Sequence, residues 1–278
     1  MAKEVKISKK KSLSSFTLYS SLSSLRPQRS FPTMGQYYVL LNLTKRQYFA
    51  DEYMTAGKMW EILYNLYNKP FVARALVELP NSPAASAGKA PRLGSWSGDR
   101  LVIIGDYSDE VPFFFTEAEK QELKSNKVKV ESSSGGTEER AMNLYGFADE
   151  HYKAVGKEHL TADSTRQELA RLFPKGKKTH HLVLNLDRKE YLDPTAFKEP
   201  ASSVEGFARL QHGVMQGLFS QLCYSSGSGG GDVEVFMTGR WAGQRIAIRE
   251  KEKIEDLDSW RDISERVVED IEEYVLND

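Results

Sequence analysis

Apolar and polar residues alternate along two stretches of the chain, and each stretch predicts a β-hairpin. In the second stretch, Leu182, Leu184 and Leu186 occupy every second position, and a polar turn at residues 187–189 precedes another short strand. Such period-two alternation, with a polar turn between two short runs, is typical of a β-hairpin. Residues 38–49 repeat the same order of strand, polar turn and strand.

A helical pattern follows each predicted hairpin. Ser202 and Glu205 have the spacing of a capping box, which satisfies the first amide groups of a helix. Six apolar residues then recur at helical spacing: Val204, Phe207, Leu210, Val214, Leu218 and Leu222. Residues 54–67 predict a helix at the corresponding place after the first hairpin. Both helices are expected to cover a sheet.

An apolar strand comes next in each part of the chain, after a Gly-x-Trp-x-Gly turn. Leu101 and Ile103 would lie on one face of this strand, and Val102 and Ile104 on the other. A strand that is apolar on both faces is typical of the middle of a covered sheet. We therefore expect residues 101–104 to form a central strand.

Each part of the chain then ends with a predicted helix. In the first part, Thr116 and Glu119 form a second capping-box pattern. In the last part, the apolar stripe consists of Trp260, Ile263, Val267, Ile271 and Tyr274. The acidic residues near the C-terminus fall on the opposite side of this stripe, so they are interpreted as a solvated helix face.

These elements recur because two blocks of sequence recur in the same order. Tyr38–Phe49 matches His181–Leu192 at an offset of 143, and a second block, with Trp96 in one copy and Trp241 in the other, matches at an offset of 145. Similar strand and turn composition is the alternative explanation, but it does not account for the nearly constant spacing. The sequence predicts an α+β fold made of two diverged copies of one unit, arranged as a pseudo-twofold pair.

The duplication predicts four segments: a head (1–33), a first α+β repeat (34–125), a polar, partly helical connector (126–178) and a second repeat (179–278). The connector begins with a Ser/Gly-rich linker and has helical patterns near 137–155 and 164–173. The head is rich in Ser and Lys and has the approximate composition of an organellar transit peptide. A disordered head, or a natural start at Met34, explains the same residues.

Composition narrows the classes of partner. The formal net charge is −1, which argues against nucleic acid or an anionic membrane as a general partner. No apolar run is long enough for an ordinary transmembrane helix, and a single cysteine, Cys223, is expected to be a buried thiol. The expected location is the cytoplasm, or an organelle if the head is a transit peptide. The sequence predicts no cofactor, no metal site and no particular oligomeric state.

The recurring motifs resemble an uncharacterised family of small microbial and fungal proteins. Its pattern includes Met-Gly-Gln-Tyr, Asn-Leu-Asp-Lys-x-Glu-Tyr, Gly-Gly-Gly-Asp, and Gly-Arg-Trp-Ala-Gly-Asp-Arg-Ile followed by Gly-Asp-Tyr. The first copy keeps residues 34–37, 98–100 and 105–107, and the second keeps 185–191, 229–232 and 239–243. The resemblance implies an architecture and no reaction. Neither copy retains the complete set, since Gln244 replaces the motif's Asp and Arg249-Glu250-Lys251 replaces Gly-Asp-Tyr.

The motifs supply the candidate ligand or structural residues, which are Trp96, Asp99, Arg100, Asp106, Asp232, Trp241 and Arg245. Asp99 and Asp106 bracket the central strand and would lie about 20 Å apart, too far for paired carboxylates at one bond. A structural role is therefore favoured, with Asp99 in a turn and Arg100 paired with a carboxylate. The tryptophans are expected to be core anchors.

Two functions fit these patterns. The favoured hypothesis is a non-catalytic binding or interaction protein, in which two similar units bind an unknown protein or small polar ligand. The alternative is an enzyme that acts on a small polar or phosphorylated ligand. Its single composite site would combine Asp99, Arg100 and Asp106 of the first copy with Asp232 of the second.

Overall fold

The computed structural model describes the parts of the chain that carry the predicted sheet and several of its helices. These are residues 38–49, 78–79, 94–106, 108, 111–131, 136–155, 167, 171–173, 181–197, 213–224 and 239–277. All of them belong to one compact unit, Gly35–Asp278. The predicted head, the helix at 54–67, the start of the helix at 202–222 and Asp232 lie outside the described residues.

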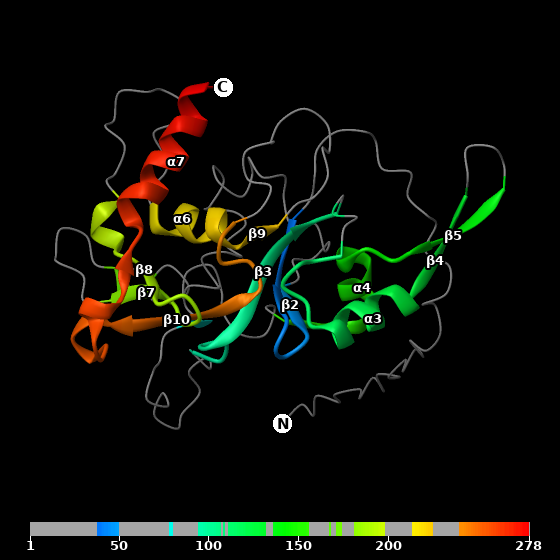
Figure 1. The fold of residues 1–278 in the computed structure, drawn as a ribbon, viewed down its shortest axis with the longest axis horizontal. Coiled ribbons are helices and arrows are strands. Elements are labelled where there is room, and N and C mark those ends of the chain that lie inside the picture. Colours follow the sequence, from blue (N-terminus) through cyan, green and yellow to red (C-terminus); the bar gives the residue numbers. More distant parts are fainter. Residues whose placement is uncertain are drawn as a thin grey trace, which may run out of the picture. The chain divides into compact units, whose positions relative to one another are not determined.

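One mixed sheet of nine strands runs through the described residues (Figure 1). Eight strands follow the order β11-β8-β7-β10-β3-β1-β2-β6, and the short β9 pairs with β3 beside them. Their bounds are β1 Tyr38–Asn42, β2 Gln47–Phe49, β3 Asp99–Gly105, β6 Lys153–Val155, β7 His181–Asn185, β8 Glu190–Leu192, β9 Cys223–Tyr224, β10 Gln244–Glu250 and β11 Arg261–Asp262.

The antiparallel pair β3–β10 lies at the middle of this order and joins the two recurring sequence blocks. Arg100 lies opposite Arg245, with Asp99 opposite Ile246 and Leu101 opposite Gln244. On one side of the pair lie β1, β2 and β6, and we call these strands together with β3 the first half. On the other are β7, β8 and β11, which with β10 form the second half. Each half ends in a short parallel edge strand, β6 beside β2 and β11 beside β8.

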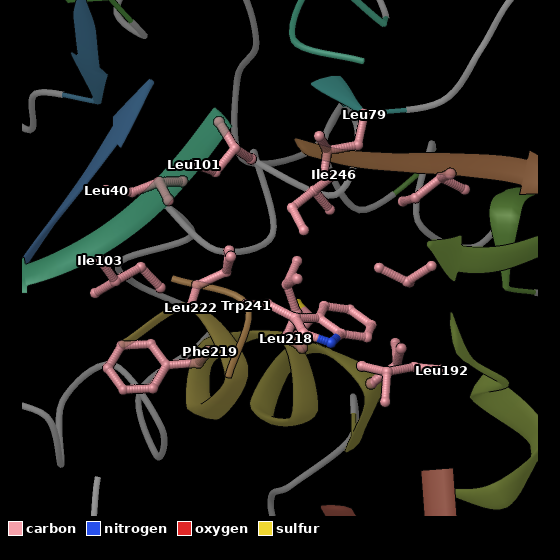
Figure 2. Packing of buried hydrophobic residues seen from close by; sticks show 14 of the residues in the cluster. Leu40, Leu79, Leu101, Ile103, Leu192, Leu218, Phe219, Leu222, Trp241 and Ile246 are labelled. Carbon is pink, nitrogen blue, oxygen red and sulfur yellow. The ribbon is translucent and has the colours of Figure 1, made fainter. Parts of the chain in front are cut away.

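Helices α6 (Gly213–Leu222) and α7 (Ser264–Asn277) cover one face of the sheet. Apolar side chains from both halves and from these helices form a single cluster there, in which Leu101, Ile103, Leu218, Trp241 and Ile246 are fully buried. Figure 2 shows Leu218, Phe219 and Leu222 of α6 facing Leu40, Leu101 and Ile246 of the sheet. This shared core ties the two halves together through burial of apolar surface.

The opposite face is covered differently in the two halves. Over the first half lie α3 (Glu117–Ser125) and α4 (Leu144–His151), which enclose a cluster with Leu41, Val102 and Ile104. Over the second half, the described part of the chain places residues 251–260, where the turns η2 (Lys251–Lys253) and η3 (Leu257–Ser259) hold Ile254 against Leu182 and Leu184. A separate hairpin is formed by β4 (Lys127–Glu131) and β5 (Thr137–Ala141), and η1 (Pro194–Ala196) follows β8.

Several predictions from the sequence are confirmed. Helices and a mixed sheet make the fold α+β, both hairpins form, and β3 is buried on both faces. Thr116 and Glu119 make the expected capping box at the start of α3, in which each side chain bonds the backbone of the other residue. Cys223 is fully buried. None of the helices in the described ranges is both long and apolar enough to span a membrane.

Two predicted helix positions are wrong. Residues 137–141 form strand β5, because pairing with β4 outweighs the helical pattern of this short charged segment. Trp260 does not belong to the last helix, since the chain first forms η3 and then β11 beside β8, and α7 begins only at Ser264. The Trp260 side chain packs instead with the cluster under residues 251–257. The predicted connector also contributes β6 to the main sheet and α4 to its cover.

Candidate functional site

An asparagine closes the hairpin turn in each half. The Asn42 Oδ1 accepts a hydrogen bond from the Lys45 amide at 2.9 Å, and the Asn185 Oδ1 accepts one from the Arg188 amide at 3.0 Å. These are turn-stabilising side-chain contacts. Each asparagine also donates from Nδ2 to the first residue of the neighbouring central strand, Asp99 at 2.7 Å and Gln244 at 2.6 Å.

Asp99 is held inside the protein by this arrangement. Besides the Asn42 amide, its carboxylate contacts the Lys45 ammonium at 2.7 Å, and the residue is only 8% exposed. Its carboxylate therefore anchors the first turn to the central strand. In the second half, the neutral Gln244 occupies the corresponding place, and its side-chain oxygen accepts the hydrogen bond from Asn185.

The two candidate tryptophans are buried and each donates its indole N–H to the first residue of the second hairpin strand. Trp96 donates to the Gln47 Oε1 at 2.9 Å, and Trp241 donates to the Glu190 Oε2 at 2.8 Å. Trp96 also stacks on Phe49, with ring centroids 4.3 Å apart. Their rings lie in the core, where they do not present a surface for stacking a ligand.

Arg100 binds the cover of the first half. Its guanidinium donates to the carbonyl oxygens of Gly243 and Phe114, at 3.1 and 2.7 Å, and pairs with Glu119 of α3 at 2.8 Å. Burial would raise the pKa of Glu119, but hydrogen bonds from Thr116 and Arg100 outweigh it and hold that pKa below its ordinary value. Arg100 thus locks α3 onto the centre of the sheet.

Arg245 lies opposite Arg100 on the same face, as directly paired residues of antiparallel strands do. It is the more exposed of the two, with 54% of its side chain accessible against 25% for Arg100. Its Nε pairs with the Asp187 carboxylate at 2.7 Å, and the same carboxylate accepts the Arg245 amide. The central arginines are therefore both engaged, one under a cover and one at the surface.

Asp99 and Asp106 are not brought together. Asp99 is the first residue of the seven-residue strand β3 and Asp106 follows its last, so the two acids lie at opposite ends of the strand. That corresponds to about 20 Å at the rise of an extended strand. The Asp106 carbonyl accepts a hydrogen bond from Asn143, which begins α4. Asp232, the third acid of the proposed composite site, lies outside the described residues.

A charged cluster that the sequence reasoning missed surrounds Glu190. This carboxylate is 1% exposed, and Arg188, Arg240 and Arg261 all converge on it; we call these three residues the arginine cluster. Arg240 contacts the Glu190 Oε1 at 3.0 Å, and Arg188 lies 3.5 Å from Oε2. Arg261 also contacts Oε1. Together with the Trp241 N–H, these groups surround both carboxylate oxygens.

The guanidiniums of this cluster repel one another. Partial burial is the main cause that lowers the pKa of Arg240, and the positive charges of Arg188 and Arg266 lower it further, while Asp270 acts in the opposite direction. The signal for this cluster was present in the sequence, because Glu190 and Arg188 stand in the Asn-Leu-Asp-Arg-Lys-Glu-Tyr motif. Only the fold brings Arg240 and Arg261 to them from 50 and 71 residues away.

Other reactive groups do not gather into a site within the described ranges. No group of three or more His, Cys, Asp or Glu side chains there is arranged to hold a metal ion. Burial raises the pKa of the Cys223 thiol, which disfavours its thiolate form. The arginine cluster thus brings three guanidiniums to one buried carboxylate.

No protein-family model, curated protein or solved structure matches this chain, so its function has to be inferred from its own residues.

Proposed function

We propose that this protein is a non-catalytic binding or interaction protein built on a duplicated α+β unit. The observation that carries the proposal is the strand order β6-β2-β1-β3 against β11-β8-β7-β10, which is the same in both halves when read from edge to centre. The register between the halves is centred on Arg100 and Arg245, which are matching residues of the two sequence blocks. A twofold axis between these residues would relate the halves.

Matching hydrogen bonds support the duplication. The Leu43 amide donates to the Arg100 carbonyl and the Leu186 amide to the Arg245 carbonyl, both at 2.9 Å. Across the central pair, Gly98 donates to Ile246 at 2.8 Å, and Gly243 donates to Leu101 at 2.7 Å. The hairpin turns also match, since Arg46 and Lys189 both have a left-handed backbone, with φ of 51° and 50°. Conformations this unusual for non-glycine residues support a common origin.

The duplicated unit extends beyond residue 125 in this proposal. Lys153 of β6 donates its amide to the Arg46 carbonyl, as Arg261 of β11 donates to the Lys189 carbonyl. β6 therefore corresponds to β11, and the first unit closes within the segment predicted to be a connector. Residues 106–152, with α3, α4 and the β4–β5 hairpin, form an insertion that the second unit replaces with residues 251–260.

Binding is favoured over catalysis because the polar motif residues stabilise turns and strands. Asp99 joins a turn to a strand, Arg100 fastens α3, and the indole of Trp96 bonds Gln47. A general acid or base has to lie within hydrogen-bond reach of the group that it serves. With Asp99 8% exposed and held by Asn42 and Lys45, its carboxylate is committed to the scaffold.

A screen for retention and turnover tests this proposal. The purified chain is incubated with a mixture of cellular metabolites, and mass spectrometry measures which compounds are retained and which are consumed. We expect stoichiometric retention without multiple turnovers. Asp99→Asn, which keeps the shape of the side chain, and Arg140→Gln on the exposed strand β5 serve as a matched pair of variants. Multiple-turnover consumption by the native chain that is lost in folded Asp99→Asn would show that the protein is an enzyme.

A further inference from the structure

More charged groups surround Glu190 than the fold requires at this position. The buried Trp241 N–H requires one acceptor, because an unpaired buried donor is costly. In the first half, the neutral Gln47 meets the same need for Trp96. The fold therefore does not require a carboxylate at this position, and still less three arginines around it.

The charges in direct contact at this place do not balance. Arg188, Arg240 and Arg261 place three positive charges around the single negative charge of the Glu190 carboxylate. One guanidinium would be enough to neutralise Glu190. The contacts with Glu190 use one nitrogen of each of the three arginines, and each guanidinium carries further N–H donors.

Helix α7 adds to the positive potential. It begins at Ser264, between Arg261 and Arg266, and Glu265 is the acid of its first turn. The N-terminus of a helix carries partial positive charge, so nearby cations are unfavourable there and anions are stabilised. The start of α7 therefore adds positive potential beside the arginine cluster, and the Asp262 carboxylate, which accepts the Ser264 amide at 2.9 Å, already compensates part of it.

We propose that the arginine cluster, Arg188, Arg240 and Arg261, binds the phosphate monoester group of a small ligand, with Glu190 holding the guanidiniums in position. This inference rests on the proposed binding function and adds the chemical class of the ligand. The partly exposed guanidiniums present planar pairs of donors, which match the oxygens of a phosphate group. A doubly charged anion also neutralises the excess charge of the cluster.

Calorimetric titration tests the proposal with three probes at constant ionic strength: inorganic phosphate, phenyl phosphate and succinate. We expect one saturable site for phosphate and phenyl phosphate, with succinate at least about tenfold weaker because its carboxylates cannot present three oxygens to one cluster. Arg188→Gln is the principal variant. Both contacts of its guanidinium within the described residues are 3.5 Å long, so its loss disturbs the fold least.

Phosphate affinity should fall about tenfold in Arg188→Gln and further in Arg188→Gln/Arg240→Gln, since each variant removes charge-assisted hydrogen bonds to the phosphate oxygens. Arg140→Gln removes an equally positive but distant, exposed arginine of β5 and should leave affinity within about twofold. Thermal unfolding and circular dichroism establish that each variant is folded. If Arg240→Gln fails to fold, Arg188→Gln alone decides the test.

Absence of saturable phosphate binding, or saturable binding that Arg188→Gln leaves unchanged, would overturn the proposed site. Tighter binding of succinate than of phosphate would overturn the ligand class. Failure of the broader function is distinguishable, because multiple-turnover consumption of a metabolite contradicts the non-catalytic role whether or not the cluster binds phosphate. The opposite outcome can also be recognised. If the protein retains a ligand that has no phosphate group, and the arginine cluster does not bind phosphate, the binding function stands and this inference is wrong.

Discussion

The surroundings of Trp96 and Trp241 differ in charge although both indoles are bonded in the same manner. In the first half the acceptor is Gln47, and the acid lies on the central strand, as Asp99. In the second half the acid is the acceptor, Glu190, and the central strand carries Gln244. At these two positions, each half thus has one carboxylate and one glutamine, and the two are exchanged between the halves. The comparison teaches that the geometry of the turn is kept while its charge is free to diverge.

The cover of the sheet provides the second difference. The first half is enclosed by α3 and α4, which the guanidinium of Arg100 helps to attach. Within the ranges that the structure describes, the second half is covered by residues 251–260 alone, and Arg245 is half exposed. Buried groups in the first half therefore have more exposed counterparts in the second half. Substitutions at matching positions measure how much this difference contributes to stability.

The largest expected difference is between Gly243→Ala and Gly98→Ala. Both glycines have positive φ, 73° and 83°, but a Cβ at Gly243 would lie 2.3 Å from the Phe114 ring, whereas at Gly98 the nearest atom is 3.9 Å away. We expect Gly98→Ala to cost about 1 kcal/mol of unfolding free energy from backbone strain, and Gly243→Ala about 3 kcal/mol or more. Urea unfolding measures both values, and equal losses would contradict the asymmetric cover.

The next largest effect on stability is expected when the residues that accept the tryptophan N–H groups are exchanged between Glu and Gln. Glu190→Gln leaves three guanidiniums without their shared carboxylate, and we expect a loss of about 2–4 kcal/mol in phosphate-free buffer. Gln47→Glu inserts a carboxylate beside Trp96, where no comparable set of arginines from the described ranges converges, and should cost about 1–2 kcal/mol. Denaturant unfolding of the two variants and of the double exchange provides the measurement. A neutral or stabilising Glu190→Gln would mean that the arginines do not depend on Glu190.

The central arginines give a smaller contrast. Arg100→Ala removes contacts with two backbone carbonyls and with Glu119, so a loss of about 2 kcal/mol is expected. Arg245→Ala removes a surface pair with Asp187 and should cost less than about 1 kcal/mol. Thermal unfolding of both variants tests the order. A larger loss of stability in Arg245→Ala than in Arg100→Ala would show that solvent exposure does not determine how much these ion pairs stabilise the fold.

The smallest effect is the pH dependence of the cover over the first half. The pKa of Glu119 is lower in the folded protein than in the unfolded chain, where it is ordinarily 4.5. The ionised Glu119 carboxylate therefore stabilises the fold fully above pH 4.5, and this contribution is lost as the pH falls through the pKa of the folded protein. The stability difference between the native chain and Glu119→Gln should therefore shrink below about pH 4.5. Unfolding at pH 7, 5 and 3.5 measures this difference, and a gap that widened toward acid would contradict the sign.

The sequence predicted the local elements well because their causes are local. The alternating leucines of 181–186, the apolar run of 101–104 and the Thr116–Glu119 capping box each form as expected. Predictions were wrong where a distant segment decides the outcome. Residues 137–141 are a strand because β4 pairs with them, and Trp260 leaves the last helix because β11 must first join β8.

The candidate site divides in the same way. The motifs singled out Arg100, Arg245 and the tryptophans, but not their surroundings, since sequence spacing gives no indication that Arg240 and Arg261 reach Glu190. Sequence alone determined the recurrence of two blocks, the hairpins and the apolar central strand, because hydrophobic periodicity and turn chemistry act over a few residues. Only the tertiary structure decided that these blocks pair with each other and that three guanidiniums meet one buried carboxylate, because strand pairing and charge burial depend on residues far apart in the chain.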